Sequence, residues 1–184
     1  MLPIIPVSPT TDICGQCKML YGASCCEDKG GGPYFPMSYG EAARIARHRK
    51  STVKDSVVVR KVPDEEKKLL RSVAGKQISD LIVNGVGLYL PRSDGQCEYL
   101  NTKCTIQNYK PYLCATFPFK LTMGVWTLGT LADSGFCLGQ DTVGEFNTAE
   151  GLKLFGETVR NLNGLHERWK RDLQSHAANM KRRK

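Results

Sequence analysis

The chain has 184 residues, of which 41% are hydrophobic and 24% are charged, with a net charge of +8. This composition is typical of one globular domain with a modest core. No apolar run approaches the ~18 residues that a membrane-spanning helix needs, so the sequence excludes a membrane span.

The positive charge is concentrated in two segments. Residues 41–61 and residues 165–184 each carry seven Lys or Arg and two acids, or +5, whereas the remainder of the chain sums to −2. Such patches suit an anionic partner, either a nucleic acid or an acidic protein. They also suit the solvated faces of helices, and no nucleic-acid-binding motif accompanies them. The sequence leaves the oligomeric state open.

The first residues lack the pattern of a secretory signal. Met1 to Asp12 contains three prolines, with no basic segment and no sustained apolar segment. We therefore expect a cytoplasmic protein with reduced cysteines rather than a secreted one stapled by disulfides. The expected organisation is a proline-rich leader at residues 1–13, a single domain at residues 14–178 and a basic tail at residues 179–184.

The first half of the domain predicts loops followed by helices. Residues 13–35 hold four cysteines and a glycine run, which favour loops. Ser38 then begins a helix, because Ser38 and Glu41 have the spacing of a capping box. The apolar stripe of this helix, which extends to about His48, is Ala42, Ile45 and Ala46. Residues 52–62 are ambiguous, because three consecutive valines favour a strand whereas their neighbours permit a helix.

A second helix and a group of strands follow. Pro63, followed by three acids, begins a helix that continues through Leu69, Leu70 and Val73. Beyond Gly75, short apolar or alternating runs predict a small antiparallel sheet with Phe119 and Trp126 in its core. These runs are residues 86–90, 104–107, 119–123 and 125–130.

The last element is a long C-terminal helix that begins at Thr148. Its apolar face is Leu152, Phe155, Val159, Leu162, Leu165, Trp169 and Leu173, and Gly164 is a position where it can break or kink. The predicted fold class is therefore α+β: a small single domain with irregular cysteine-rich loops, a short antiparallel sheet and several helices.

Eight cysteines make a thiolate metal centre the leading interpretation of the chemistry. Two cysteines in a CxxC spacing can bind one metal, and a vicinal pair follows them closely. The gaps of the second group lack the repeated CxxC of zinc ribbons, which favours an iron-sulfur cluster while leaving zinc open. Eight thiolates suffice for two sites of four, or for one site with spare or redox thiols. The predicted metal ligands are Cys14, Cys17, Cys25, Cys26, Cys97, Cys104, Cys114 and Cys137.

Other polar side chains are weaker candidates. His48, His166 and His176 lie in basic, helical surroundings, and we predict that they are surface residues. Asp94, Glu98 and Asp133 lie beside cysteines, where they can accept hydrogen bonds, act as acid or base groups, or simply face solvent. No catalytic residue is assigned.

The order of these motifs resembles the YkgJ-type cysteine-cluster family of zinc- or iron-chelating domains. Residues 14–26 resemble the CxxC and vicinal CC with which the family's pattern opens. Residues 37–41 resemble its Ser/Thr-x-x-Glu helix start, and residues 95–100 resemble its G-x-C-x-x-L element. Residues 104–118 are similar to its C-x-I-Y-x-x-R-P-x-x-C-R-x-F-P. This chain departs from that pattern at Gln107, Lys110 and Ala115, and the final C-P-G-x-G is reduced to residues 137–139.

This resemblance implies a metal-binding protein whose thiolates hold an iron-sulfur cluster of the 4Fe-4S type or zinc. The arginines that the family has at positions 110 and 115 do not carry over. Relatives linked to protein lysine methylation imply an alternative, an enzyme or accessory factor related to that S-adenosylmethionine-dependent reaction. A redox or electron-transfer protein is a further alternative. The downstream role is not predicted.

Overall fold

The structure is a computed structural model that describes residues 35–74, 76–101, 104–116, 119–128, 152 and 158–181. These residues confirm the α+β class, with helices, short antiparallel strand pairs and a long C-terminal helix. The elements, in chain order, are α2 (Tyr39–His48), α3 (Val53–Ser56), β1 (Val58–Lys61), α4 (Asp64–Ala74), the 3-10 helix η1 (Lys76–Leu81), β2 (Val86–Tyr89), β3 (Arg92–Ser93), β4 (Gln96–Cys97), the 3-10 helix η2 (Gln107–Tyr109), α5 (Tyr112–Thr116), β5 (Phe119–Thr122), β6 (Val125–Leu128) and α8 (Val159–Lys181).

Helix α2 begins as the sequence predicts. The Ser38 side chain accepts a hydrogen bond from the Glu41 N–H, and the Glu41 side chain reaches back to the Ser38 backbone. The stripe of Ala42, Ile45 and Ala46 is buried, and the helix ends at His48. The capping box and the apolar stripe are therefore both confirmed.

The ambiguous segment at residues 52–62 contains both a helix and a strand. Thr52 and Asp55 form a second capping box that begins the single turn α3. The chain then extends into β1, which pairs antiparallel with β2 from Val58 opposite Tyr89 to Lys61 opposite Val86. The next helix, α4, follows Pro63 as predicted and buries Leu70.

The strands pair differently from the single predicted sheet. Within the described residues they form three separate two-stranded antiparallel pairs, β1–β2, β3–β4 and β5–β6. Met123 and Gly124 turn the β5–β6 hairpin, with φ of 50° and 81°. The run at residues 104–107 is not a strand: Cys104 forms one isolated bridge to Leu100, and Gln107 begins η2. An apolar alternation of four residues was too short to fix the backbone there.

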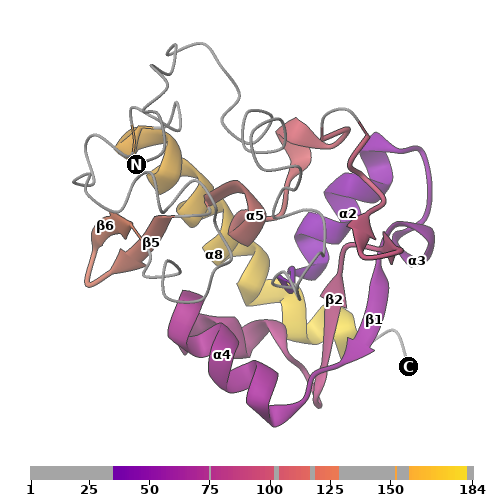
Figure 1. Cartoon of the computed structure of the whole chain (residues 1–184), viewed down its shortest axis with the longest axis horizontal. Helices are drawn as coiled ribbons and strands as arrows, with labels where there is room; N and C mark the ends of the chain where they lie inside the picture. Colours follow the sequence, from indigo (N-terminus) through magenta and orange to yellow (C-terminus); the bar gives the residue numbers. More distant parts are fainter. Residues whose placement is uncertain are drawn as a thin grey trace, which may run out of the picture.

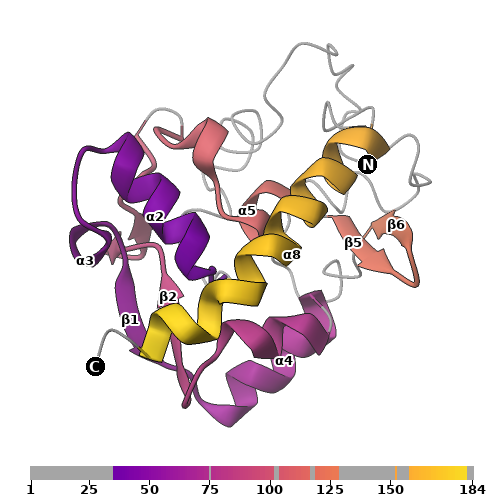
Figure 2. The same ribbon diagram turned by 180° about the vertical axis from the view of Figure 1, so that it is seen from behind.

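Helix α8 crosses the whole domain and packs against α2, η1 and α5 (Figures 1 and 2). It begins at Val159 rather than at the predicted Thr148, because Thr158 is not helical and its hydroxyl accepts from the Asn161 N–H at 3.1 Å. Such an N-cap begins a new helix. The helix then continues through Gly164 without a break.

The predicted apolar face of α8 is only partly correct. Leu162 and Trp169 are buried, and Leu152, Leu165 and Leu173 are partly buried. Val159, however, is 48% exposed, because it lies in the first turn at the end of the packed face. Phe155 and Thr148 lie outside the described residues.

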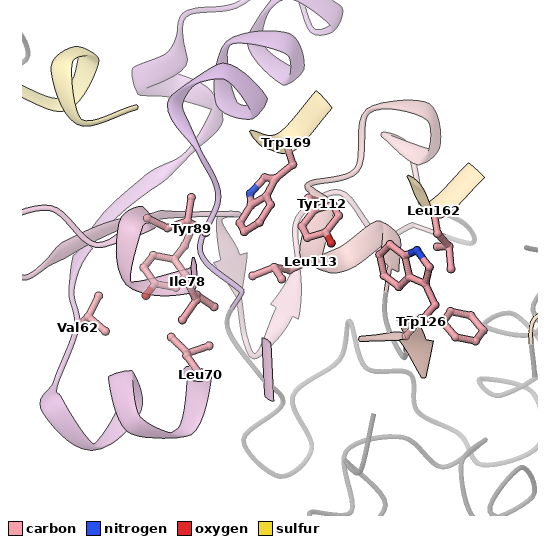
Figure 3. Close-up of a cluster of buried hydrophobic side chains, with 11 residues drawn as sticks. Val62, Leu70, Ile78, Tyr89, Tyr112, Leu113, Trp126, Leu162 and Trp169 are labelled. Carbon is pink, nitrogen blue, oxygen red and sulfur yellow. The ribbon is translucent and has the colours of Figure 1, made fainter. Parts of the chain in front are cut away.

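Two hydrophobic clusters form the core. The larger one joins η1, α5, β6 and α8, and Figure 3 shows the Trp169 ring over Tyr112 with Trp126 and Leu162 beyond them. Phe119 and Trp126 are buried in this cluster, as predicted. The second cluster lies under α2 and contains Met37, Ile45, Leu88, Cys97, Tyr99, Ile106 and Met180.

Candidate metal centre

Three of the eight predicted metal ligands lie in the described residues. Cys97 is buried in β4, Cys104 is half-buried just before η2, and Cys114 is half-buried in α5. None of the three forms a disulfide with another described residue. The other five, Cys14, Cys17, Cys25, Cys26 and Cys137, lie outside the described residues.

A tight hairpin presents Cys97. Asp94 and Gly95, both with positive φ, turn the chain so that Arg92 pairs with Cys97. An Asp-Gly pair favours this turn, since Asp tolerates the left-handed region and Gly has no Cβ to clash. The Asp94 side chain itself is exposed, as is that of Glu98. Asp133 lies outside the described residues.

A second reversal brings the chain back past Cys97. The Leu100 N–H donates to the Cys97 carbonyl at 2.9 Å, and Leu100 forms a bridge with Cys104. The Thr105 N–H donates to the Tyr99 carbonyl at 2.8 Å. Cys97 and Cys104 consequently lie on the two arms of one short turn and contribute to the same hydrophobic cluster.

Tyr99 anchors this reversal to the rest of the domain. Its ring is buried, and its hydroxyl donates to the Ser56 carbonyl at 2.7 Å. The Arg49 guanidinium lies 5.1 Å from the ring centroid and donates to the same hydroxyl. Packing and hydrogen bonds of Tyr99 therefore anchor the turn that carries the two cysteines.

Glu41 holds the helix that carries Cys114. One carboxylate oxygen accepts from the Ser38 N–H at 2.6 Å and from the Ser38 hydroxyl at 2.8 Å. The other oxygen accepts from the Tyr112 N–H, the first residue of α5. The capping motif predicted only the first of these roles. A carboxylate near the N-terminus of a helix is also favoured by the helix dipole.

Burial governs the ionisation of this region. Desolvation raises the pKa of Glu41, although hydrogen bonds from Ser38 and Tyr112 oppose the shift. Burial and the nearby Glu41 raise the pKa of Tyr112, so its phenol stays protonated at neutral pH. The Tyr112 hydroxyl shares a hydrogen bond of 3.0 Å with Nδ1 of His166, whose pKa is lowered chiefly by burial.

The prediction that the histidines are surface residues holds for His48 but is wrong for His176. His176 is fully buried: Nδ1 accepts from the Tyr39 N–H at 2.9 Å, and Nε2 lies 3.2 Å from the Leu81 carbonyl. Because Nδ1 accepts, the ring proton lies on Nε2 and is donated to Leu81. His166 is half-buried among Tyr112, Trp126 and Trp169.

The described side chains do not by themselves form a metal site. In the part of the chain that the structure describes, no three His, Cys, Asp or Glu side chains form a group that can hold a metal ion. Cys97 and Cys104 offer two soft sulfur donors on one turn, which fits zinc or iron and sulfur. A set of four thiolates that includes this pair requires further donors.

Comparison with protein-family models, with curated proteins and with solved structures finds no match to this chain. No described helix is both long enough and apolar enough to cross a membrane.

Proposed function

We propose that this protein binds a metal through cysteine thiolates, either as an iron-sulfur cluster or as zinc. The observation that carries the proposal is the turn in which Leu100 hydrogen bonds to Cys97 and bridges to Cys104. Two cysteine sulfurs on the arms of one protein-stabilised turn can bind one metal. The resemblance to cysteine-cluster proteins supports the same chemistry.

The second support is the anchoring of Cys114. Metal binding is favoured when ligands are held in place before the metal arrives, because less chain entropy is then lost on binding. Glu41 fixes the first residue of α5, two positions before Cys114, to the start of α2. A buried carboxylate thus links the predicted Ser-x-x-Glu helix start to the cysteine-containing segment that follows Pro111.

The proposal assigns the remaining ligands to Cys14, Cys17, Cys25, Cys26 and Cys137. A cluster bound by these thiolates would supply one-electron chemistry, whereas zinc would order the surrounding loops. Either group requires thiols that stay reduced, so we place the protein in the cytoplasm. The redox and methylation-related roles depend on which metal is bound.

Anaerobic purification with measurement of iron, acid-labile sulfide and zinc tests the proposal. We expect either a brown protein with iron and sulfide or a colourless one with stoichiometric zinc. Cys97→Ser and Cys114→Ser should each lower the metal content. Ala115→Ser is the matched control, because it places the same hydroxyl group at the half-buried position next to Cys114.

The fold must be checked in the same samples by circular dichroism. Wild-type protein that is folded and free of metal would overturn the proposal. So would Cys97→Ser and Cys114→Ser variants that retain the full metal content of the Ala115→Ser control.

A further inference from the structure

The end of α2 and the start of α3 lie away from α4 (Figure 1), and exposed basic side chains form a surface there. We define this basic surface by six exposed side chains: Arg47, His48, Arg49, Lys50, Lys54 and Tyr109. Five come from a short stretch of chain that contains two helix ends, and Tyr109 comes from η2, which packs beside α2.

The four cations of the basic surface are exposed, and Arg49 also donates a hydrogen bond to the Tyr99 hydroxyl. The ion pairs found among the described residues involve Arg44, Arg60, Lys67 and Lys170, none of which belongs to the basic surface. Two acids lie in the same stretch of chain, and exposed Asp55 offsets part of the charge of its neighbour Lys54. Glu41 is buried, and Asp55 accepts hydrogen bonds from the N–H and hydroxyl of Thr52.

The same surface carries a pair of stacked flat rings. The His48 and Tyr109 rings lie 4.2 Å apart between centroids with an interplanar angle of 21°. Tyr109 is 39% exposed although it stacks on His48. Its backbone is fixed, because its N–H donates at 2.8 Å to the carbonyl of buried Ile106.

We propose that the basic surface binds single-stranded nucleic acid. Lysine and arginine side chains neutralise phosphates, and exposed aromatic rings stack on unpaired bases. The basic surface combines the two features within a few residues, with cations on both sides of His48 along the chain. An acidic peptide would engage the cations but would gain nothing specific from the stacked rings. The proposal does not depend on a bound metal.

Fluorescence anisotropy with a labelled oligouridine of about 12 nucleotides tests this surface. Single-strand binding has a log–log salt slope of about −0.7 per neutralised phosphate, so four cations predict a slope of about −3. Reversal of two charges, Arg47→Glu with Lys54→Glu, should weaken binding and reduce the slope to about −1.4. Lys68→Glu with Arg160→Glu is the matched control, because it changes the net charge equally at exposed positions on α4 and α8.

The stacking step is tested separately at Tyr109. Tyr109→Leu should weaken oligouridine binding about tenfold, whereas Tyr109→Phe should retain most of it, because the phenyl ring still stacks. Neither change should affect binding of a polyglutamate peptide. Circular dichroism verifies that each variant is folded.

Two results would overturn the proposal. One is an equal loss of oligouridine affinity in the Arg47→Glu, Lys54→Glu variant and in its control on α4 and α8. That result would show that binding depends only on net charge. The other is binding of polyglutamate as tight as that of oligouridine, with Tyr109→Leu leaving both unchanged, which would identify an acidic protein as the partner.

Discussion

The buried carboxylate of Glu41 accepts a hydrogen bond from the backbone N–H of Tyr112, 71 residues along the chain. The same carboxylate caps its own helix through Ser38. One side chain thus stabilises the first turns of α2 and α5. Burial makes this arrangement sensitive to substitution, since any donor left without an acceptor has no water to replace it.

Glu41→Ala should therefore lower the free energy of unfolding by about 3 kcal/mol, because the N–H groups of Ser38 and Tyr112 both lose their acceptor. Glu41→Gln keeps the shape but provides only one acceptor oxygen, so about half of that loss is expected. Urea unfolding at pH 7 measures both. Glu98→Gln, at an exposed position, is the control. Stabilities within about 0.5 kcal/mol of wild type would refute the assigned role.

A glycine allows α2 and α8 to approach closely at Asp172. A Cβ added to Gly40 would overlap the Asp172 carboxylate, which forms two hydrogen bonds with the Arg44 guanidinium at 2.9 and 2.7 Å. Gly40→Ala should therefore destabilise the protein by about 1–2 kcal/mol despite its better helix propensity.

That cost should become much smaller once Asp172 is shortened. In an Asp172→Ala background, Gly40→Ala should cost at least about 1 kcal/mol less than in wild type, because the carboxylate overlap is gone and only the 3.2 Å approach to the Cβ of residue 172 still opposes the gain in helix propensity. A double-mutant cycle measured by urea unfolding isolates this coupling. Additive effects of the two substitutions would show that the helices do not make this contact.

Buried His176 should make stability depend on pH. Burial lowers the pKa of His176 below its ordinary value of 6.5. Protonation of Nδ1 would also break the hydrogen bond that Nδ1 accepts from the Tyr39 N–H. The folded state thus binds this proton less readily than the unfolded state. The associated stability is present above pH 6.5 and is lost as the pH falls below that value.

The comparison that isolates this effect is wild type against His176→Gln. The stability advantage of wild type should shrink as the pH falls from 7.5 towards 5, by at most about 1.4 kcal/mol per pH unit. His48→Gln, at an exposed position, is the control for the loss of a histidine. Parallel profiles for wild type and His176→Gln would contradict the assignment.

Two apolar residues of α8 should respond very differently to truncation. Leu162 is fully buried, so Leu162→Ala should lower the free energy of unfolding by about 3 kcal/mol through lost burial and a residual cavity. Val159, three residues earlier, is 48% exposed, and Val159→Ala should change stability by less than about 0.5 kcal/mol. Similar losses at both positions would mean that the helix packs on the face that the sequence alone predicts.

Local chemistry was enough to predict several elements. The Ser38 and Glu41 spacing predicted the start of α2, and Pro63 with the acids after it predicted α4, because helix ends are fixed by nearby hydrogen bonds and charges. Buried aromatic positions such as Trp126 could also be predicted, since a large apolar ring has little alternative to the core.

Sequence reasoning failed at His176, whose surroundings come from distant segments, and at residues 104–107, where the chain turns back on itself. The burial of His176 depends on the Tyr39 N–H and the Leu81 carbonyl, which supply its two hydrogen-bond partners from elsewhere in the chain. The strand expected at residues 104–107 became a bridge and a 3-10 turn, because Cys104 pairs locally with Leu100.

The sequence alone determined the number and spacing of the cysteines, the uneven basic charge and the starts of α2 and α4, all of which depend on residues close together in the chain. Tertiary structure decided that Tyr99 anchors the Cys97–Cys104 turn to Ser56, that Glu41 also anchors α5, and that His48 stacks on Tyr109. These relationships join segments that meet only when the core packs, and their free energy depends on burial that no local pattern encodes.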